Sequence, residues 1–529
     1  MNDNDSAHRR PVTPVLADGH TLTLGDVAEV ALNGAARPLS VPDDAVQRMN
    51  ASLKLKQELI EEGAAIYGVT SGFGDSSGQR IPPEQSEELQ RHLVRFLGTG
   101  VGPIAPADVT RATMLIRANC LARGHSAVRP ELVQLLVACL SADILPRIPE
   151  RGSVGASGDL VPLSYIARLL TGTGEVHVAG GGTGTAEEAL KRAGLTPVVL
   201  EAKEGLALLN GTSFMSGFAA LAVHGAQQIA FAADLCTALT SQLRHGNPAH
   251  FEDFLFAQKP HPGTRAAAAR LRELIDGSGA YDAADDVDSL QDPYSIRCAP
   301  HVTGVLADTL TWVTDWMTTE INSSNDNPLF NTGRRAAENG GNFYGGHVGL
   351  AMDALKTAVA SVGDLLDRQL ELVVDEKFND LTANLAPHPR GNGDSQASLN
   401  HGFKGMQITA SALVAEALKN TMSATSFSRS TEAHNQDKVS MGTIAARDAH
   451  TVTHLVLHVT AIHLLALCQA ADLRGPHLLS PATRTAYDLI RTHSPYLDTD
   501  RPLDQDIETI TRLIADGTLK TALTQQHDS

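Results

Sequence analysis

The stretch Arg151–Leu170, RGSVGASGDLVPLSYIARLL, joins a glycine-rich turn directly to an apolar, helix-like segment. Gly152, Gly155 and Gly158 can adopt backbone angles that other residues avoid, which predicts a tight turn. A turn that leads into a helix also offers free N–H groups to a phosphate. No Lys-Ser/Thr pair follows the glycines as in a P-loop, so phosphate binding is the weaker alternative.

The tripeptide Ala156-Ser157-Gly158 in this turn can also react with itself. Because Gly158 has no side chain, its amide nitrogen can approach the Ala156 carbonyl. Loss of two waters, one of them from the Ser157 side chain, then leaves an exocyclic methylidene. That group is an electrophile, which protein side chains rarely supply. The residues alone therefore indicate a covalent catalyst, or a plain turn in a helical scaffold that never cyclises.

The whole string GSVGASGDLVPLS resembles the signature of the aromatic amino acid ammonia-lyases and aminomutases, and the bacterial phenylalanine ammonia-lyases most of all. Similar segments follow in the family's order over most of the chain: IYGVTSGFG around Tyr67, EGLALLNGTS around Asn210, DPYSIRC around Tyr294 and Arg297, NSSNDNPLF around Asn325, GGNFYGG around Phe343, and TEAHNQDKVSMG around Gln436. The resemblance implies that Ala156, Ser157 and Gly158 form a 4-methylideneimidazole-5-one (MIO) group autocatalytically, with no metal or nucleotide.

The resemblance also assigns roles. Tyr67 would take the β-proton of the substrate, for which its pKa of about 10 would have to be lowered by positive charge or hydrogen bonds. Its glycine-rich setting favours a mobile lid. Arg297 would hold the substrate carboxylate through two parallel hydrogen bonds, beside the hydroxyl of Tyr294. Four more residues are implied in this pocket: Asn210 beside the MIO oxygen, Gln436 near the substrate, Asn325 and Phe343.

Four further residues bear on the substrate. The segment LQRHLVRFLGTG contains Phe96-Leu97, the pair that the family's phenylalanine lyases carry, whereas tyrosine lyases have His-Leu and histidine lyases Ser-His. A phenyl ring favours such apolar walls, and a phenol or imidazole needs a polar partner. Lys404 and Glu432 also match phenylalanine lyases, although the surroundings of Glu432 are similar to tyrosine lyases and aminomutases too.

Composition excludes several other classes of function. The 42 basic and 60 acidic residues give a formal charge of -18, which disfavours binding to nucleic acid or to an anionic membrane. The five scattered cysteines indicate neither a disulfide framework nor a zinc site, and no HExxH spacing occurs among the 21 histidines. With no apolar run near 18 residues and no signal-peptide pattern, we expect a cytoplasmic protein.

Helical periodicity predicts the fold class. Beyond Glu204, stripes such as Val348, Met352, Leu355 and Val359 recur at helical spacing, in segments of up to about 30 residues. We expect a mainly α protein: a long-helix bundle with an N-terminal α-rich mixed domain that carries the MIO loop, assembled as an intertwined homotetramer. The predicted parts are a flexible tail (1–20), the MIO-bearing domain (21–204) and the bundle with C-terminal helices (205–529). His454, His458 and His463 are expected at the surface or an interface.

The expected function is therefore non-oxidative deamination of L-phenylalanine to trans-cinnamate and ammonia, in sites that the resemblance implies are shared between subunits. Phenylalanine or tyrosine 2,3-aminomutase activity is an open alternative, because an aminomutase shares every motif quoted and differs only in retaining the cinnamate and adding the amine back. Tyrosine ammonia-lyase activity, giving p-coumarate, is a third.

Overall fold

The computed structural model describes residues 14–34, 37–281, 290–387 and 399–524. The chain divides into two compact units, each made of segments that are distant in sequence. Unit 1 comprises Met1–Leu221, Thr314–Met352 and Ser423–Arg447; unit 2 comprises Ala222–Val313, Asp353–Met422 and Asp448–Ser529. The sequence boundaries near residues 20 and 204 stay a prediction, and residues 1–13 of the predicted tail lie outside the described residues.

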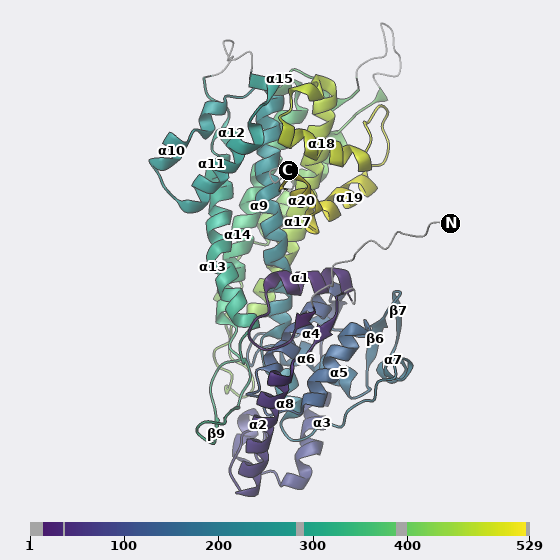
Figure 1. Ribbon diagram of the computed structural model, residues 1–529, viewed down its shortest axis with the longest axis vertical. Coiled ribbons are helices and arrows are strands. Elements are labelled where there is room, and N and C mark those ends of the chain that lie inside the picture. The colour runs from purple at the N-terminus through teal and green to yellow at the C-terminus, as the bar shows by residue number, and fades with distance from the viewer. Residues whose placement is uncertain (1–13, 35–36, 282–289, 388–398, 525–529) are drawn as a thin grey trace, which may run out of the picture. The chain divides into compact units, whose positions relative to one another are not determined.

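Unit 1 is built from shorter helices and four small sheets, of which β6, β7 and β9 lie at its edges (Figure 1). The helices that lie wholly in it are α1 (Leu24–Asn33), α2 (Asp43–Glu61), α3 (Ser86–Phe96), α4 (Ala107–Ala122), α5 (Pro130–Ser141), α6 (Leu160–Leu170), α7 (Ala186–Arg192) and α8 (Glu204–Leu209). The strand pairs are β1 (Val15–Leu16) with β2 (Leu39–Ser40), β3 (Val101–Ile104) with β5 (Pro149–Arg151), β6 (Glu175–Val178) with β4 (Leu145–Pro146) and β7 (Gly182–Thr185), and β8 (Leu329–Asn331) with β9 (Ala336–Glu338). Only β1 and β2 are parallel.

Unit 2 is dominated by long helices that run side by side (Figure 1). These are α9 (Ser213–Leu243), α13 (Ala299–Ile321), α14 (Gly346–Val374) and α17 (Gly442–Arg474), and the unit boundaries fall inside all four. The shorter helices of unit 2 are α10 (Asp253–Ala257), α11 (Pro262–Ile275), α12 (Tyr294–Arg297), α15 (Glu376–Asn379), α16 (Lys404–Lys419), α18 (Pro481–His493), α19 (Asp504–Ala515) and α20 (Thr518–Thr524). Helices of 29, 31 and 33 residues confirm the predicted long-helix architecture.

Glycines allow these long helices to pack closely. A Cβ at Gly225 of α9 would lie 2.6 Å from the Thr453 side chain of α17, and one at Gly363 of α14 would lie 2.8 Å from Val456. Helix α17 is long and apolar enough to cross a membrane, but 78% of its apolar window is buried within the protein, as in a core helix. His463 on α17 is fully buried within the chain, so the predicted position at the surface or an interface is wrong.

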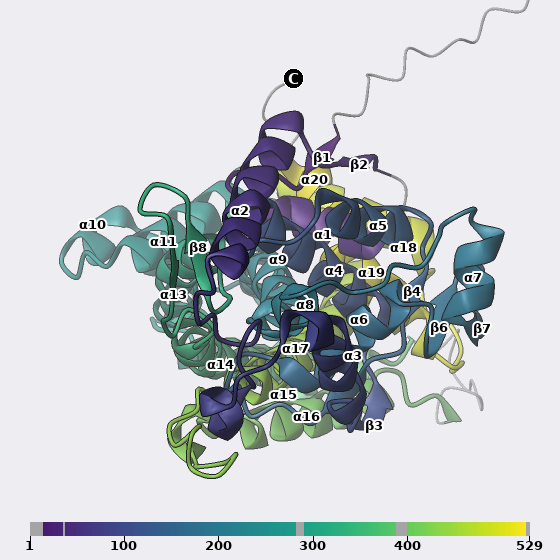
Figure 2. The same ribbon diagram turned by 90° about the horizontal axis from the view of Figure 1, so that it is seen from below.

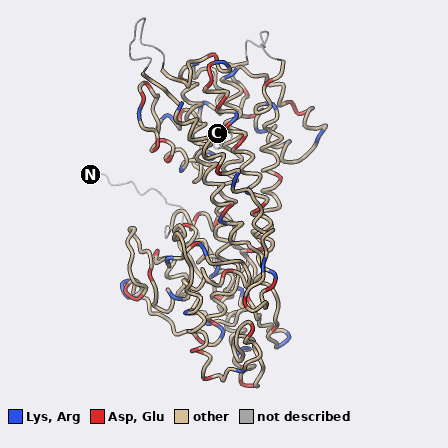
Figure 3. The backbone as a smooth tube through the Cα atoms, turned by 180° about the vertical axis from the view of Figure 1, so that it is seen from behind, with Lys and Arg blue, Asp and Glu red and all other residues tan. Residues whose placement is uncertain are grey.

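The described residues show neither a long run of like charge along the backbone nor a disulfide. Acidic and basic residues are interspersed along the backbone (Figure 3). All five cysteines are free thiols, and four of them are buried.

Three helices of unit 1, α3, α6 and α8, pack against one another (Figure 2). Helix α6 begins at Leu160, directly after the glycine-rich turn, as predicted. Behind the loop that contains Tyr67, a buried apolar cluster is formed by Leu55, Leu59, Ile66, Val69, Ala127 and Phe330. Because Ile66 and Val69 flank Tyr67, this cluster anchors both sides of the loop through burial of apolar surface.

Candidate active site

Unit 1 contains a cavity of about 280 Å³ that is lined by nine of the predicted site residues. They are Tyr67, Phe96, Leu97, Ala156, Ser157, Gly158, Asn210, Glu432 and Gln436. The cavity volume is near the lower limit for small-molecule sites. Segments almost 370 residues apart therefore contribute to one site, which is the first structural indication that the scattered motifs act together.

The turn that contains Ala156, Ser157 and Gly158 is held from two sides. Gly158 has a φ of +68° and pairs with Gly211 in a parallel bridge, so close that a Cβ on Gly158 would lie 2.1 Å from the Gly211 oxygen. On the other side, the main-chain N–H and the hydroxyl of Ser440 both donate to the Gly155 oxygen, at 3.2 and 3.0 Å. Only glycine fits at position 158, which explains the sequence pattern physically.

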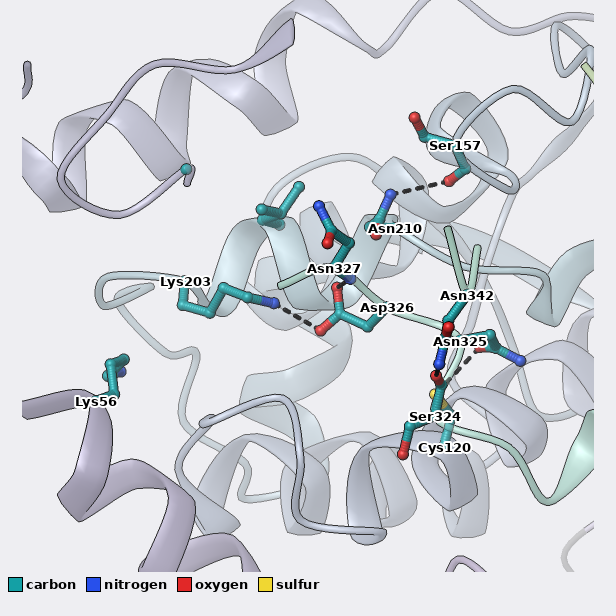
Figure 4. A network of polar contacts seen from close by, with 12 residues as sticks. Lys56, Cys120, Ser157, Lys203, Asn210, Ser324, Asn325, Asp326, Asn327 and Asn342 are labelled. Carbon is teal, nitrogen blue, oxygen red and sulfur yellow. Dashed lines mark hydrogen bonds and ion pairs between the residues drawn. The ribbon is translucent and has the colours of Figure 1, made fainter. Parts of the chain in front are cut away.

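Two N–H donors converge on the main-chain oxygen of Ser157. Asn210 Nδ2 donates to it at 3.1 Å (Figure 4), and the main-chain N–H of Gly211 donates at 3.3 Å. Gln436 Nε2 donates to Ser157 Oγ at 3.1 Å. The Oδ1 atom of Asn210 is buried and has no hydrogen-bond partner among the described residues. The site thus contains two N–H donors directed at one oxygen, an oxyanion-type arrangement, and a buried amide oxygen on Asn210 that is not used as an acceptor by the described residues.

A buried carboxyl group follows the turn. Asp159 is fully buried, and burial raises its pKa to about 6 against the opposing effect of its hydrogen bonds. Its carboxylate accepts from the Ser153 hydroxyl at 2.9 Å, from the Thr443 hydroxyl, and from the main-chain N–H of Met215 at 2.8 Å. These bonds connect the turn to the first turns of α17 and α9, so Asp159 holds the glycine-rich turn in place.

Tyr67 lies in the cavity with its hydroxyl oxygen accepting the Gly74 N–H at 2.8 Å. The pKa of Tyr67 is raised above its ordinary value, because burial disfavours the phenolate and the nearby Glu432 carboxylate repels it; the Gly74 N–H acts in the opposite direction. The lowered pKa that proton abstraction would require of Tyr67 is therefore not present within this chain. The hydrogen bond to the hydroxyl exists, but burial outweighs it, and among the described residues no positive charge opposes the rise in pKa.

Glu432 lies on a tight, left-handed stretch of backbone. Glu432, Ala433 and His434 have φ values of 52°, 51° and 63°, a run that non-glycine residues rarely adopt. The turn is closed by two main-chain hydrogen bonds between Thr431 and Gln436. The Glu432 carboxylate accepts from Asp75 N at 3.1 Å and from Asn435 Nδ2 at 2.8 Å. This conformation points a carboxylate and an amide into one cavity.

The end of α3 forms an apolar part of the cavity wall. Phe96 and Leu97 both line it, together with Leu93, Val154, Val161 and Leu206. Phe96 is 60% exposed, whereas Leu97 is 9% exposed. The side chain of Phe96, which the sequence analysis expects beside the substrate, is therefore only partly buried by residues of its own chain.

Asn325 and Phe343, which were expected in the same pocket, are placed differently. Asn325 is buried behind the turn, where its Oδ1 accepts from Arg117 Nη2 at 3.4 Å and from Cys120 Sγ at 3.2 Å (Figure 4). Arg117 itself donates to the Asn210 oxygen at 2.9 Å. Asn325 therefore supports the backbone of Asn210 and does not line the cavity. Phe343 is half-buried and is not part of the cavity wall.

Tyr294, Arg297 and Lys404 belong to unit 2, whereas the cavity is lined by unit 1 residues. Tyr294 is 70% exposed, and the guanidinium carbon of Arg297 lies 4.4 Å from the centre of its ring. Arg297 Nε donates to the Asp292 oxygen at 3.1 Å, and its terminal nitrogens have no hydrogen-bond partner among the described residues. The exposed ring and the available guanidinium form a preassembled pair on α12.

A buried ion pair that the sequence analysis missed fixes the start of α8. Lys203 and Asp326 are both fully buried, with Nζ 2.6 Å from Oδ2 (Figure 4). Lys203 has a φ of +79° and directly precedes α8, which ends next to Asn210. Lys56 Nζ donates to the Ala202 oxygen at 2.8 Å, and burial lowers its pKa to about 8. In the sequence, Lys203 stands between Glu201 and Glu204 in the segment LEAKEG, directly before LALLN.

Within the residues that the structure describes, no group of three or more His, Cys, Asp or Glu side chains could hold a metal ion.

Comparisons with a family model, with curated relatives and with solved structures all point to the same family. A family model described as aromatic amino acid lyase matches residues 22–492. Histidine ammonia-lyase from Gloeobacter violaceus is 38% identical over 96% of this chain and 97% of its own length, and that from Anaeromyxobacter sp. is 41% identical over 96% and 99%. The crystal structure of tyrosine aminomutase from Streptomyces globisporus matches with a TM-score of 0.89 at 35% identity, covering 97% of this chain and 99% of that one. These matches do not support a particular resemblance to bacterial phenylalanine ammonia-lyases.

Proposed function

This chain belongs to the aromatic amino acid lyase family, and we propose that it deaminates L-phenylalanine to trans-cinnamate and ammonia through an MIO group formed from Ala156, Ser157 and Gly158. One observation carries the proposal: two N–H donors converge on the Ser157 oxygen in a cavity that also contains Tyr67. We also propose a cytoplasmic location, which the five free thiols support. We further propose a homotetramer with shared active sites, which is supported by the distribution of the predicted site residues over both units of the chain.

The residues fit the MIO group. Ring closure forms a bond between Gly158 N and the Ala156 carbonyl carbon; the Ala156 oxygen and the Ser157 hydroxyl leave as two waters. The Ser157 main-chain oxygen then becomes the exocyclic carbonyl oxygen of the group, and Asn210 and Gly211 already donate to it. When formed, the group would supply an electrophilic carbon, which would make the substrate amine a better leaving group.

The other residues bind, orient and move protons. Asn210 Nδ2 and Gly211 N stabilise negative charge on the Ser157 oxygen, the arrangement that contributes most to many such reactions. Tyr67 Oη accepts the β-proton of the substrate. Because its pKa is raised in the isolated chain, we propose that a positive group, such as Arg297 or the substrate ammonium, lowers it in the assembled site.

Phenylalanine is favoured by the apolar wall at Phe96 and Leu97. A phenyl ring buries apolar surface there and leaves no polar group unpaired, whereas a phenol or an imidazole would need a partner from this wall. We propose that Tyr294, Arg297 and Lys404 contribute to the site of another copy. The exposed ring of Tyr294 and the available guanidinium of Arg297 support this for the first two residues.

Histidine is the second candidate substrate. The two relatives named above are histidine ammonia-lyases, and Glu432 presents a carboxylate to the cavity that could accept an imidazole N–H. Aminomutase activity stays an alternative hypothesis, because the matching tyrosine aminomutase shares this fold over almost its full length.

The deciding experiment offers L-phenylalanine, L-tyrosine and L-histidine separately to the purified protein and separates all products, including β-amino acids. Cinnamate and ammonia from phenylalanine alone support the proposal. Urocanate from histidine would instead indicate a histidine ammonia-lyase, and p-coumarate from tyrosine would indicate a tyrosine ammonia-lyase. A β-amino acid product would indicate an aminomutase. An intact mass equal to that of the encoded chain, without the loss of two waters (about 36 Da), would overturn the covalent mechanism.

A further inference from the structure

Gln90 is a fully buried polar residue on the inner face of α3. Its neighbours on that face, one helical turn apart, are Ser86, Leu93, Val94 and Leu97, all buried. Leu97 follows α3 directly and lines the cavity. A buried side-chain amide is unfavourable unless its donor and its acceptor are both satisfied. The partners of Gln90 therefore indicate why an amide occupies this position.

The amide of Gln90 joins two segments of the site. Its Oε1 accepts the main-chain N–H of Leu206 at 2.9 Å, and its Nε2 donates to the Gly68 oxygen at 3.0 Å. Leu206 lies in the first turn of α8, whose N–H groups have no partner within the helix, and α8 ends next to Asn210. Gly68 directly follows Tyr67. Gln90 thus bonds to the backbone on both the Tyr67 side and the Asn210 side of the cavity.

Two glycines near Gln90, Gly68 and Gly205, leave too little space for a larger residue. A Cβ on Gly205 would lie 2.9 Å from Gln90 Oε1. A Cβ on Gly68, which has a φ of +66°, would lie 2.7 Å from the Leu206 side chain. The loop after Tyr67 and the start of α8 therefore approach each other as closely as their side chains allow, with the Gln90 amide between their backbones.

We infer that Gln90 is a positioning residue that sets the placement of the Tyr67 hydroxyl relative to the Ser157 segment; this rests on the proposed function. The amide is needed because one side chain must donate to one segment and accept from the other, which an aliphatic or carboxylate side chain cannot do. Proton transfer is sensitive to displacements of about 1 Å, so loss of one of the two bonds slows the step at Tyr67 before it affects substrate binding.

The test compares Gln90→Glu with Ser86→Ala. A glutamate has the same length and keeps an acceptor for the Leu206 N–H, but it can donate to Gly68 only while it is protonated. The variant is therefore compared with the wild type across pH, and its expected loss refers to the high-pH end, where the glutamate is ionised. Ser86 is on the same helix and its hydroxyl donates to Val69 of the same loop at 3.2 Å, so Ser86→Ala controls for a general loosening of α3. Gln90→Met, of similar length and without either hydrogen bond, is the second variant.

Four quantities are measured on the full-length enzyme: intact mass, kcat and KM for the substrate that the wild type turns over, the isotope effect with β-deuterated substrate, and amide exchange of residues 66–75. For Gln90→Glu we expect the loss of about 36 Da to persist, kcat to fall at least about 10-fold with KM within about 3-fold, a larger isotope effect, and faster exchange of the loop. Ser86→Ala should change kcat less than about 3-fold.

Other outcomes overturn the inference. If Gln90→Glu and Gln90→Met keep kcat within about 2-fold of the wild type, or if kcat falls with an unchanged isotope effect and unchanged loop exchange, Gln90 does not position Tyr67. If Ser86→Ala reproduces the loss in full, the effect belongs to α3 as a whole. A wild type without the mass deficit and without turnover would instead refute the proposed function itself, and the catalytic role of Gln90 with it.

Discussion

Asn210 Nδ2 lies 3.1 Å from the main-chain oxygen of Ser157, the oxygen that would become the exocyclic carbonyl oxygen of the MIO group. The main-chain N–H of the next residue, Gly211, donates to the same oxygen, and Arg117 holds the Asn210 carbonyl from behind. Because these donors are fixed by buried groups, they need no rearrangement when negative charge develops.

Asn210→Ala should therefore lower kcat by about 10²–10³-fold with a smaller change in KM, the usual consequence of losing one oxyanion donor. Steady-state kinetics measures this, and intact mass shows whether the ring still forms. A loss of less than about 10-fold in a variant with a complete ring would mean that Asn210 does not stabilise charge in the transition state.

Ser157→Ala should abolish turnover while the helix content stays that of the wild type, because only the hydroxyl that leaves as water is removed. The intact mass of the variant should equal its encoded mass, whereas the wild type should be about 36 Da lighter than encoded. Appreciable residual deamination in this variant would contradict the MIO assignment.

Phe96→His should raise the use of tyrosine relative to phenylalanine, because an imidazole in the apolar wall gives a phenol a hydrogen-bond partner and gives a phenyl ring none. The ratio of kcat/KM values for the two substrates is the measurement. An unchanged ratio would show that the side chain at position 96 does not contact the substrate ring.

Glu432→Gln should shift the rising limb of the pH–kcat profile to lower pH. Burial raises the pKa of Tyr67, and the Glu432 carboxylate raises it further by disfavouring the nearby phenolate. Removal of that charge lowers the pKa, so the basic form of Tyr67 becomes available at lower pH. Glu187→Gln on exposed α7 is the matched control. A limb that stays in place, or that moves to higher pH, would remove Tyr67 as the titrating base.

Lys203→Met should reduce the free energy of unfolding by about 3–5 kcal/mol, because it leaves Asp326 buried without its partner. The double variant Lys203→Met/Asp326→Leu should recover much of that loss, since it removes both buried charges. Denaturant unfolding of the two variants and the wild type measures the difference. Equal destabilisation of the single and double variants would argue against an ion-pair origin.

Local features of the sequence determined a large part of this protein. The tripeptide Ala156-Ser157-Gly158, the apolar pair Phe96-Leu97 and the helical stripes of α14 and α17 are each contained in a short segment, and backbone sterics and burial periodicity act over such distances. The mainly helical class and the long helices could be predicted for that reason.

Only the tertiary structure decided the environments of the individual side chains. It showed that burial raises the pKa of Tyr67, that Asn325 supports Asn210 from behind the turn, and that Gln90 bonds to both Gly68 and Leu206. Each of these depends on contacts between segments far apart in the chain, and the desolvation and hydrogen bonding that set them have no counterpart in the local sequence.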